Sequence, residues 1–382
     1  MAKAVVAHWK DIQTDDDISN RSTASVTREV EHTIGSRTAR RWLRKLGFNY
    51  KEYRKGIYND GHEREDIKTY RDHVFLPRMA AYANEFLRWD ENLQEILNDL
   101  HLTGEKKPLI LVTQDESTFN ANDGKHFIWI HPDHQPLRKK GRGQGLHVSD
   151  FLTPIGRLGH GDACIIMKCG GDTWWTGDKL LDQVIDKAIQ AFEAQFPGCK
   201  ALFAFDNSRN HCKFANDAFR VCEMNLEPGG KNAKPMRDTY VVDVNHPAGG
   251  YMQAMKFPDG TLKGLRKVLL EPGFWPENRR FLAQCSIKSA TGKSAKPNPR
   301  CLNGGSCCAC ALLAAQPDFQ AQKNQIEEAI IKAGHEVIYY PAFHCEINFI
   351  EYFWGAAKYY ARERCEYDFE SLKRTVPEAL AS

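Results

Sequence analysis

The sequence contains no long hydrophobic run. Among its most apolar stretches is Leu109–Thr113, far short of the roughly 18 residues that a membrane-spanning helix needs. The first residues, MAKAVVAHWKDIQ, also lack the apolar segment of a signal peptide, because His8 and Lys10 interrupt it. We therefore expect a soluble intracellular protein with no membrane partner.

Cysteine is too sparse for a small disulfide-bonded scaffold, since the chain has 12 cysteines in 382 residues. We expect these to be free thiols or metal ligands.

There is no internal repeat. A content of 42% apolar and 26% charged residues excludes a mostly disordered chain, a collagen-like repeat and an uninterrupted coiled coil. At roughly 150 residues per domain, the length predicts two or three domains.

Positive charge is concentrated near the N-terminus. The net charge is only +3, yet residues 33–56 hold eight basic residues and a single acidic one. A helix is predicted there, with Ser36 as its N-cap and Gly47 as its stop. Its apolar stripe has helical spacing and consists of Ala39, Trp42, Leu43 and Leu46. The basic residues around that stripe suit the second helix of a helix-turn-helix, which presents arginines to a DNA groove: Arg37, Arg40, Arg41, Arg44 and Lys45.

The alternative for this helix is a solvated basic face without a partner. Residues 48–58 are predicted to form a basic hairpin or wing beside it.

A second basic segment contains Arg138, Lys139, Lys140 and Arg142. It is either a loop that contacts a DNA backbone or a solvated hairpin tip. The glycines at 141–145 follow no strand and lack a G-K-[ST] ending, so we expect no nucleotide cofactor.

The pattern from Pro108 onward predicts a mixed α/β sheet with flanking helices. The expected strands are residues 109–112, 126–131, 145–152, 164–168, 201–205 and 337–340. The expected helices are 62–102 with a break at Pro77, 177–196, one near 211–222, 320–334 and 346–362. The predicted domains are a helix-turn-helix region at 1–60, a helical linker at 61–107, a sheet domain at 108–222 and 335–382, and a Gly/Pro/Cys-rich insertion at 223–334.

Two of the expected strands end in an aspartate, Asp115 and Asp206. Carboxylates at strand ends can share Mg²⁺, which prefers oxygen ligands, and two such ions can promote phosphodiester displacement. A third carboxylate is expected on the last helix. Glu346 and Glu351 are roughly 140° apart around a helix, so one site cannot easily use both. Glu351 lies on the side expected to meet the sheet, whereas Glu346 is interpreted as a cap at the helix start.

These residues occur in segments that resemble the DDE transposases of the mariner superfamily, especially a fungal transposon-derived branch called DDE superfamily endonuclease. The resemblance extends from about residue 36 to 364, apart from the insertion. The segments are SRTARRWLRKLGF (36–48), KGIYNDGHERED (55–66), TQDES (113–117), GQGLHVSDFL (143–152), FDNSRNH (205–211) and FHCEINFIEYFWG (343–355). The N-x-I-E-x-x-W-G match is the specific one. Because of the insertion, Asp206 and Glu351 are separated by 145 positions (206 to 351), far more than in the family.

The resemblance implies a ribonuclease-H-like fold and cleavage and transfer of DNA strands with Mg²⁺ or Mn²⁺. It implies Asp115, Asp206 and Glu351 as catalytic metal ligands, supported by Asn207, His211 and Asn348. The expected partner is double-stranded DNA, at transposon ends and target, bound by a homodimer in the nucleus. The alternatives are a domesticated, inactive DNA-binding protein of the same fold and a structure-selective nuclease without strand transfer.

The predicted insertion contains a cysteine cluster. Cys285, Cys301, Cys307 and Cys310 could form a four-thiolate zinc site. However, there is only one C-x-x-C pair, Cys308 has no role in that scheme, and small buried thiols are common. From the spacing alone we expect no stoichiometric zinc.

Overall fold

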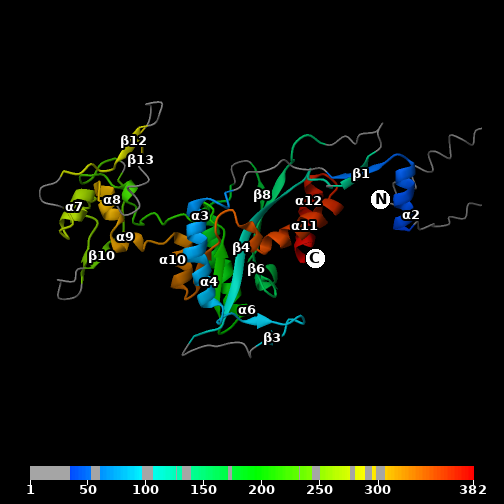
Figure 1. Ribbon diagram of the computed structural model, residues 1–382, viewed down its shortest axis with the longest axis horizontal. Helices are drawn as coiled ribbons and strands as arrows, with labels where there is room; N and C mark the ends of the chain where they lie inside the picture. Colours follow the sequence, from blue (N-terminus) through cyan, green and yellow to red (C-terminus); the bar gives the residue numbers. More distant parts are fainter. Residues whose placement is uncertain are drawn as a thin grey trace, which may run out of the picture.

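A six-stranded mixed sheet forms the centre of the computed structural model (Figure 1). The structure describes residues 35–52, 61–96, 106–125, 127–130, 139–170, 174–231, 233–242, 250–275, 280–288, 295–297 and 306–382. The strands are β4 (Leu109–Asn120), β6 (Gly145–Thr153), β7 (Gly156–Arg157), β8 (Ile165–Cys169), β9 (Lys200–Phe205) and β14 (Glu336–Tyr339). A short 3₁₀ helix, η3 (Leu158–Gly161), follows β7.

The strand order is β14-β9-β4-β6, and both β7 and β8 pair with β6. Strands β4, β6 and β8 are antiparallel neighbours, whereas β9 joins β4 and β14 joins β9 in parallel. Each parallel connection requires a crossover, and helices supply both. This order, with helices on the two faces, is the ribonuclease-H-like mixed α/β fold, so the predicted fold class is confirmed.

One face of the sheet is covered by the helical run predicted at 177–196. It consists of α5 (Gly177–Gln183), the π-helical segment η4 (Val184–Ala188) and α6 (Ile189–Gln195), and α10 (Gln325–Lys332) lies beside it. Phe192 of α6 packs on Phe203 of β9. Ile326 and Ile330 of α10 are fully buried in the same core. Although α10 lies within residues 223–334, which were assigned to the insertion, it packs with the main sheet.

The opposite face is covered by two groups of helices. The first is α3 (Glu65–Tyr70), the π-helical η1 (Arg71–Phe75) and α4 (Leu76–Tyr82). The second is α11 (Ile350–Arg364), preceded by the 3₁₀ helix η7 (Cys345–Ile347), and α12 (Phe369–Ala381). Phe75 packs with Leu202 and Tyr340 over β9 and β14, whereas Trp354 packs with Phe119 and Val148 over β4 and β6.

The helix predicted over 62–102 is shorter than expected. The helical run ends at Tyr82, and a hairpin of β2 (Arg88–Trp89) and β3 (Glu95–Ile96) follows. Pro77 does not break the run, because it lies in the first turn of α4, where a proline is tolerated. The π turn η1 directly precedes α4 and changes the hydrogen-bond pattern at this point.

The insertion folds around a small core of its own and lies to one side of the sheet (Figure 1). Its elements are η5 (Val221–Glu223), β10 (Thr239–Val242), β11 (Gly250–Gln253), α7 (Leu265–Leu270), β12 (Ser286–Lys288), β13 (Ala295–Pro297), α8 (Ala309–Ala314) and α9 (Pro317–Gln320). Leu265, Leu269 and Leu313 are buried in that core. The helix predicted near 211–222 is wrong, because turns and η5 occupy this stretch.

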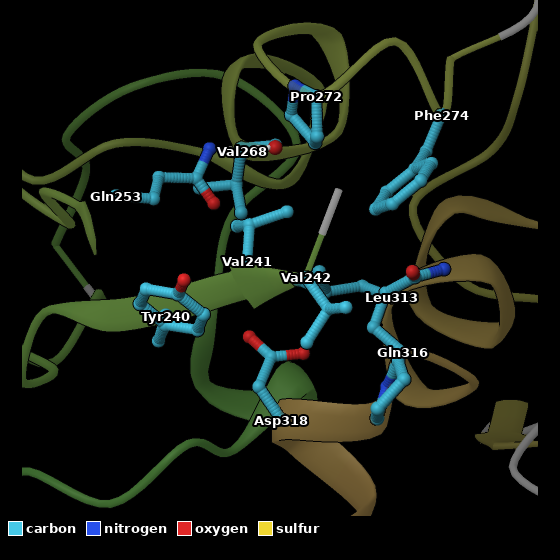
Figure 2. A pocket seen from close by; sticks show the side chains of 11 residues that line it. Tyr240, Val241, Val242, Gln253, Val268, Pro272, Phe274, Leu313, Gln316 and Asp318 are labelled. Carbon is cyan, nitrogen blue, oxygen red and sulfur yellow. Dashed lines mark hydrogen bonds between the residues drawn. The ribbon is translucent and has the colours of Figure 1, made fainter. Parts of the chain in front are cut away.

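Figure 2 shows a pocket in the insertion, lined by residues of β10, α7, α8 and α9. Its volume is about 30 Å³, which is enough for water molecules but not for a substrate. Asp318 lines it, and its carboxylate accepts a hydrogen bond from Thr239 Oγ1 at 2.7 Å. The pocket is therefore not a candidate active site.

The basic N-terminal helix is present as α2 (Ser36–Lys45). It ends as predicted, since Gly47 has a left-handed φ of 83°. Its N-cap is Gly35 instead of Ser36, and no side chain caps it. The predicted wing hairpin is corrected: β1 (Asn49–Glu52) pairs with β5 (Phe127–Ile130), and residues 53–60 lie outside the described residues. Strand β5, expected in the central sheet, therefore lies outside it.

Within the described residues, no helix combines the length and the apolar character that crossing a membrane requires.

Candidate active site

Asp115 and Asp206 lie on adjacent parallel strands. The prediction that Asp115 ends its strand is wrong, because β4 continues to Asn120 and pairs Asp115 with Asp150 of β6. On the other side, β4 and β9 pair Thr113 with Ala204. Two residues further along, the same register places Asp115 level with Asp206, which directly follows β9. Side chains alternate along a strand, so Asp115 projects from the face that α11 covers, while Asp206 lies just past the end of the neighbouring strand.

Helix α11 is fixed to β4 by polar contacts at its start. Trp354 Nε1 donates a hydrogen bond to Asp115 Oδ2 at 3.1 Å. Thr113 Oγ1 donates to Asn348 Oδ1 at 2.6 Å and accepts from the Tyr340 hydroxyl at 3.1 Å. Glu351 precedes Trp354 by three residues, so the two lie on neighbouring positions of the helix surface. The aromatic residue that fixes the helix thus also sets Glu351 near Asp115, on which its charge acts.

The negative charges of Glu351 and Asp206 act on the carboxyl group of Asp115. Asp115 is 8% exposed, and burial raises its pKa to about 7, with further contributions from the negative charges of Glu351, Glu116 and Asp206. The Asp206 side chain is 48% exposed, and Glu351 is also exposed. The site therefore has a buried carboxylate at its base and two that are open to solvent. A donor set made only of carboxylate oxygens suits a hard divalent cation such as Mg²⁺ or Mn²⁺.

The three carboxylates do not form a tight cluster. Among the described residues, two other groups of three possible metal ligands have donor atoms that all lie within 4.8 Å of one another. They are Cys285 with Cys307 and Cys308, and His62 with His344 and Glu346.

His211 links the two sides of the site. Its Nδ1 lies 2.5 Å from Asp206 Oδ1, and its Nε2 lies 3.1 Å from Glu116 Oε1. Burial acts to lower the pKa of this imidazole, but its hydrogen bonds to Asp206 and Glu116 outweigh burial and raise the pKa to about 10. Although burial acts in the opposite direction, the same contacts hold the pKa of both carboxyl groups below the usual values. We interpret His211 as an imidazolium that orients Asp206.

Glu116 is a residue that the sequence pattern did not single out. It follows Asp115 on a strand, so it faces the other side of the sheet. There its carboxylate accepts hydrogen bonds from Trp175 Nε1 at 2.8 Å and from Gln114 Nε2 at 3.2 Å. Only the extension of β4 through this position could have indicated a buried, paired glutamate, and the strand was predicted to stop before it.

The other supporting residues differ in their surroundings. Asn348 is buried and bonded to Thr113, whereas Asn207 is exposed and accepts only a weak bond from Cys212 Sγ at 3.5 Å. Glu346 is not the cap of α11, because the N-cap is Phe349 without a side-chain bond. Its carboxylate instead lies 2.6 Å from His344 Nδ1 and 3.6 Å from His62 Nε2.

The predicted DNA-binding residues of α2 are exposed, and Leu43 on its apolar stripe is buried. A helix-turn-helix requires a preceding helix, and that stretch lies outside the described residues. In the second basic segment, Lys139, Lys140 and Arg142 are exposed. Lys139 Nζ donates to the Tyr367 carbonyl at 2.7 Å. Arg138 lies outside the described residues.

The cysteines predicted as a possible zinc site do not come together as expected. Cys285 and Cys307 lie together, but with Cys308 as the third thiol. Cys310 is directed elsewhere, because its Sγ donates to the Val221 carbonyl at 3.7 Å. Cys301 lies outside the described residues.

No family model matches the chain, and no curated protein matches it. Among solved structures it is similar to the Mos1 transposase paired-end complex with the left transposon end (13% identity, TM-score 0.27). It is also similar to the Mos1 mariner paired-end complexes with Mn (13%, 0.27) and with Mg (11%, 0.26). Each match covers 55% of this chain and 62% of the Mos1 chain, less than two thirds of it. TM-scores this low assign neither fold nor function.

Because its pKa is raised, Asp115 is expected to lower the stability of the metal-free protein at high pH. A folded-state pKa of about 7, against an ordinary value of 3.8, means that wild-type stability is lost as the pH rises from about 4 through 7. Asp115→Asn removes this charge, so we expect a higher Tm than wild type at pH 8 in EDTA, and a difference that disappears near pH 4. Scanning calorimetry across this range measures it. Asp186→Asn, at an exposed position, is the control; an equal gain in both variants would contradict the assignment.

Proposed function

We propose that this protein is a divalent-metal-dependent transposase of the DDE type, which cleaves DNA at transposon ends and joins the freed strand to target DNA. The observation that supports this most is the placement of Asp115 and Asp206 at the same level of adjacent strands, with Glu351 on the helix whose Trp354 bonds Asp115. An isolated aspartate near a strand end is commonly a turn or capping residue. A mostly buried aspartate on which the charges of two further acids act is not explained by a turn or a cap.

In this proposal, Asp115, Asp206 and Glu351 hold Mg²⁺ or Mn²⁺. When bound, such ions polarise the phosphodiester and activate the attacking oxygen. The chain's own residues orient the carboxylates: Trp354 holds Asp115, His211 holds Asp206, and the bond between Asn348 and Thr113 fixes the start of the helix that carries Glu351. No side chain is assigned as a nucleophile, so no covalent protein–DNA intermediate is expected.

The DNA partner is proposed to bind through the basic residues of α2 and of the 138–142 segment. Lysine and arginine contacts to phosphates release counterions, and this makes affinity fall steeply with salt. We further propose that two copies act together on DNA in the nucleus.

The test of activity is nicking of an oligonucleotide carrying the element's own terminus, in Mg²⁺ or Mn²⁺. If the wild-type protein binds this DNA but never nicks it, the chain is an inactive DNA-binding relative of the same fold.

Removing the arginines of α2 is expected to weaken DNA binding. In the triple variant Arg40→Ala, Arg41→Ala, Arg44→Ala, the slope of log K against log salt should fall by up to about 3, since each lost phosphate contact contributes about 0.9. Fluorescence anisotropy at several salt concentrations measures this slope. A control variant replaces three exposed lysines far along the chain, Lys231, Lys256 and Lys332, with alanine. Equal losses of DNA affinity in the two variants would mean that binding depends on the overall positive charge and not on α2.

A further inference from the structure

Three thiols of the insertion converge although they come from two separate segments. Cys285 directly precedes β12, and Cys307 and Cys308 directly precede α8. Their sulfur atoms all lie within 4.8 Å of one another. None of the three forms a disulfide. The cluster lies in a different part of the fold from the carboxylates of the proposed active site, and the proposed function makes no use of it.

Backbone hydrogen bonds hold the two segments side by side. The amides of Ala309 and Cys310 donate to the carbonyls of Leu282 and Ala283 at 3.0 and 2.9 Å. This pairing brings the chain before β12 alongside the start of α8. Cys308 is then fully buried at the edge of the insertion core, Cys285 is half-buried and Cys307 is exposed. The cluster therefore has one buried and one open side, as expected of a site that a metal can enter.

From this geometry we propose that Cys285, Cys307 and Cys308 bind a structural zinc ion. With Zn–S bonds of about 2.3 Å in tetrahedral geometry, ligand sulfurs lie about 3.8 Å apart, so the cluster is near the required arrangement. The fourth position is left to water or to another donor. Thiolates are soft ligands that select zinc over Mg²⁺, so this site and the carboxylate site would bind different metals.

The short elements of the insertion give such an ion a structural role. The unit has two-stranded sheets and helices of six residues or fewer. A metal that binds only the folded site adds its binding free energy to the stability of that site. The ion would join the segment before β12 to the start of α8. Cysteine spacing alone points to Cys310 as a ligand, whereas its thiol is directed towards Val221.

The test is the zinc content of the full-length protein. Protein purified under reducing conditions from zinc-supplemented cells should contain about one zinc per chain by elemental analysis, as a single site per chain requires. Cys307→Ser is the leading variant, because Cys307 is exposed and its replacement leaves the core packing unchanged. Cys307→Ser and Cys285→Ser should each lose most of the zinc. Cys345→Ser, at an exposed cysteine outside the insertion, and Asp115→Asn should keep it.

Cobalt substitution provides a second measurement, and its wild-type spectrum does not depend on whether a variant folds well. Co²⁺ in the wild-type protein should give the strong near-ultraviolet absorption of thiolate-to-metal charge transfer, and Cys307→Ser should reduce it. Three outcomes would overturn the proposal: a wild-type protein without zinc, zinc fully retained in Cys307→Ser and Cys285→Ser, or a disulfide among the three cysteines in the reduced preparation. None of these outcomes depends on whether the protein nicks DNA.

Discussion

Asp115→Asn, Asp206→Asn and Glu351→Gln are each expected to abolish nicking of the element's own terminus in Mg²⁺. Each amide keeps the size of the side chain but loses the charge that a divalent cation requires. A loss of at least about a hundredfold in the nicking rate is expected for each, as for other groups that stabilise charge in a transition state. DNA binding should be unchanged, because the cations of α2 lie on a separate element. Nicking and gel-shift assays on the same protein preparations separate the two effects.

Glu363→Gln is the matched control for Glu351→Gln. Both glutamates lie on α11, but Glu363 is paired with Lys125 at 2.8 Å near the far end of the helix. This surface pair is worth about 1 kcal/mol or less, so the variant should nick at the wild-type rate. Glu346→Gln is a second control, because Glu346 contacts His344 and His62 instead of the aspartates. If Glu346→Gln stops nicking while Glu351→Gln does not, the third carboxylate has been assigned to the wrong glutamate.

The sheet was largely predictable from the sequence because its strands are buried apolar runs with clear ends. The segments at 145–152, 201–205 and 337–340 all appear as strands of the sheet. The helical run at 177–196 was also predicted, since its apolar residues recur with helical spacing. The strand at 109–112 was predicted too short. Its continuation carries polar residues such as Gln114 and Asp115, which are buried where β4 pairs with β6.

The errors arose where long-range pairing overrides local pattern. Residues 127–130 form an apolar run typical of a sheet strand, but they pair with β1 instead of the central sheet. The cysteine spacing indicated Cys310 as a ligand, whereas backbone pairing between the two segments brings Cys308 to Cys285. Likewise, the roles of Glu116 and Trp354 depend on contacts between distant segments, His211 with Glu116 and Trp354 with Asp115. A single sequence contains no local signal for such contacts.

His211→Gln is expected to destabilise the protein strongly. The imidazole is fully buried between Asp206 and Glu116, and removal of one partner from a buried ion pair costs about 3–5 kcal/mol because the remaining charge is left unpaired. Its folded-state pKa of about 10 lies above the ordinary value of 6.5. Its stabilising contribution is therefore complete below about pH 6.5 and is lost as the pH rises through 10. Urea unfolding at pH 6, 8 and 10 measures the effect.

The shape of the pH dependence distinguishes a charged His211 from a merely well-packed one. Wild-type stability should decline between pH 8 and 10 more steeply than that of His211→Gln, so the two curves should converge at high pH. His147→Gln is the control, because burial lowers the pKa of His147 and no carboxylate is bonded to its ring within the described residues. A constant difference between wild type and His211→Gln at all three pH values would mean that packing alone is lost. Convergence would instead support an imidazolium that holds Asp206 in position for metal binding.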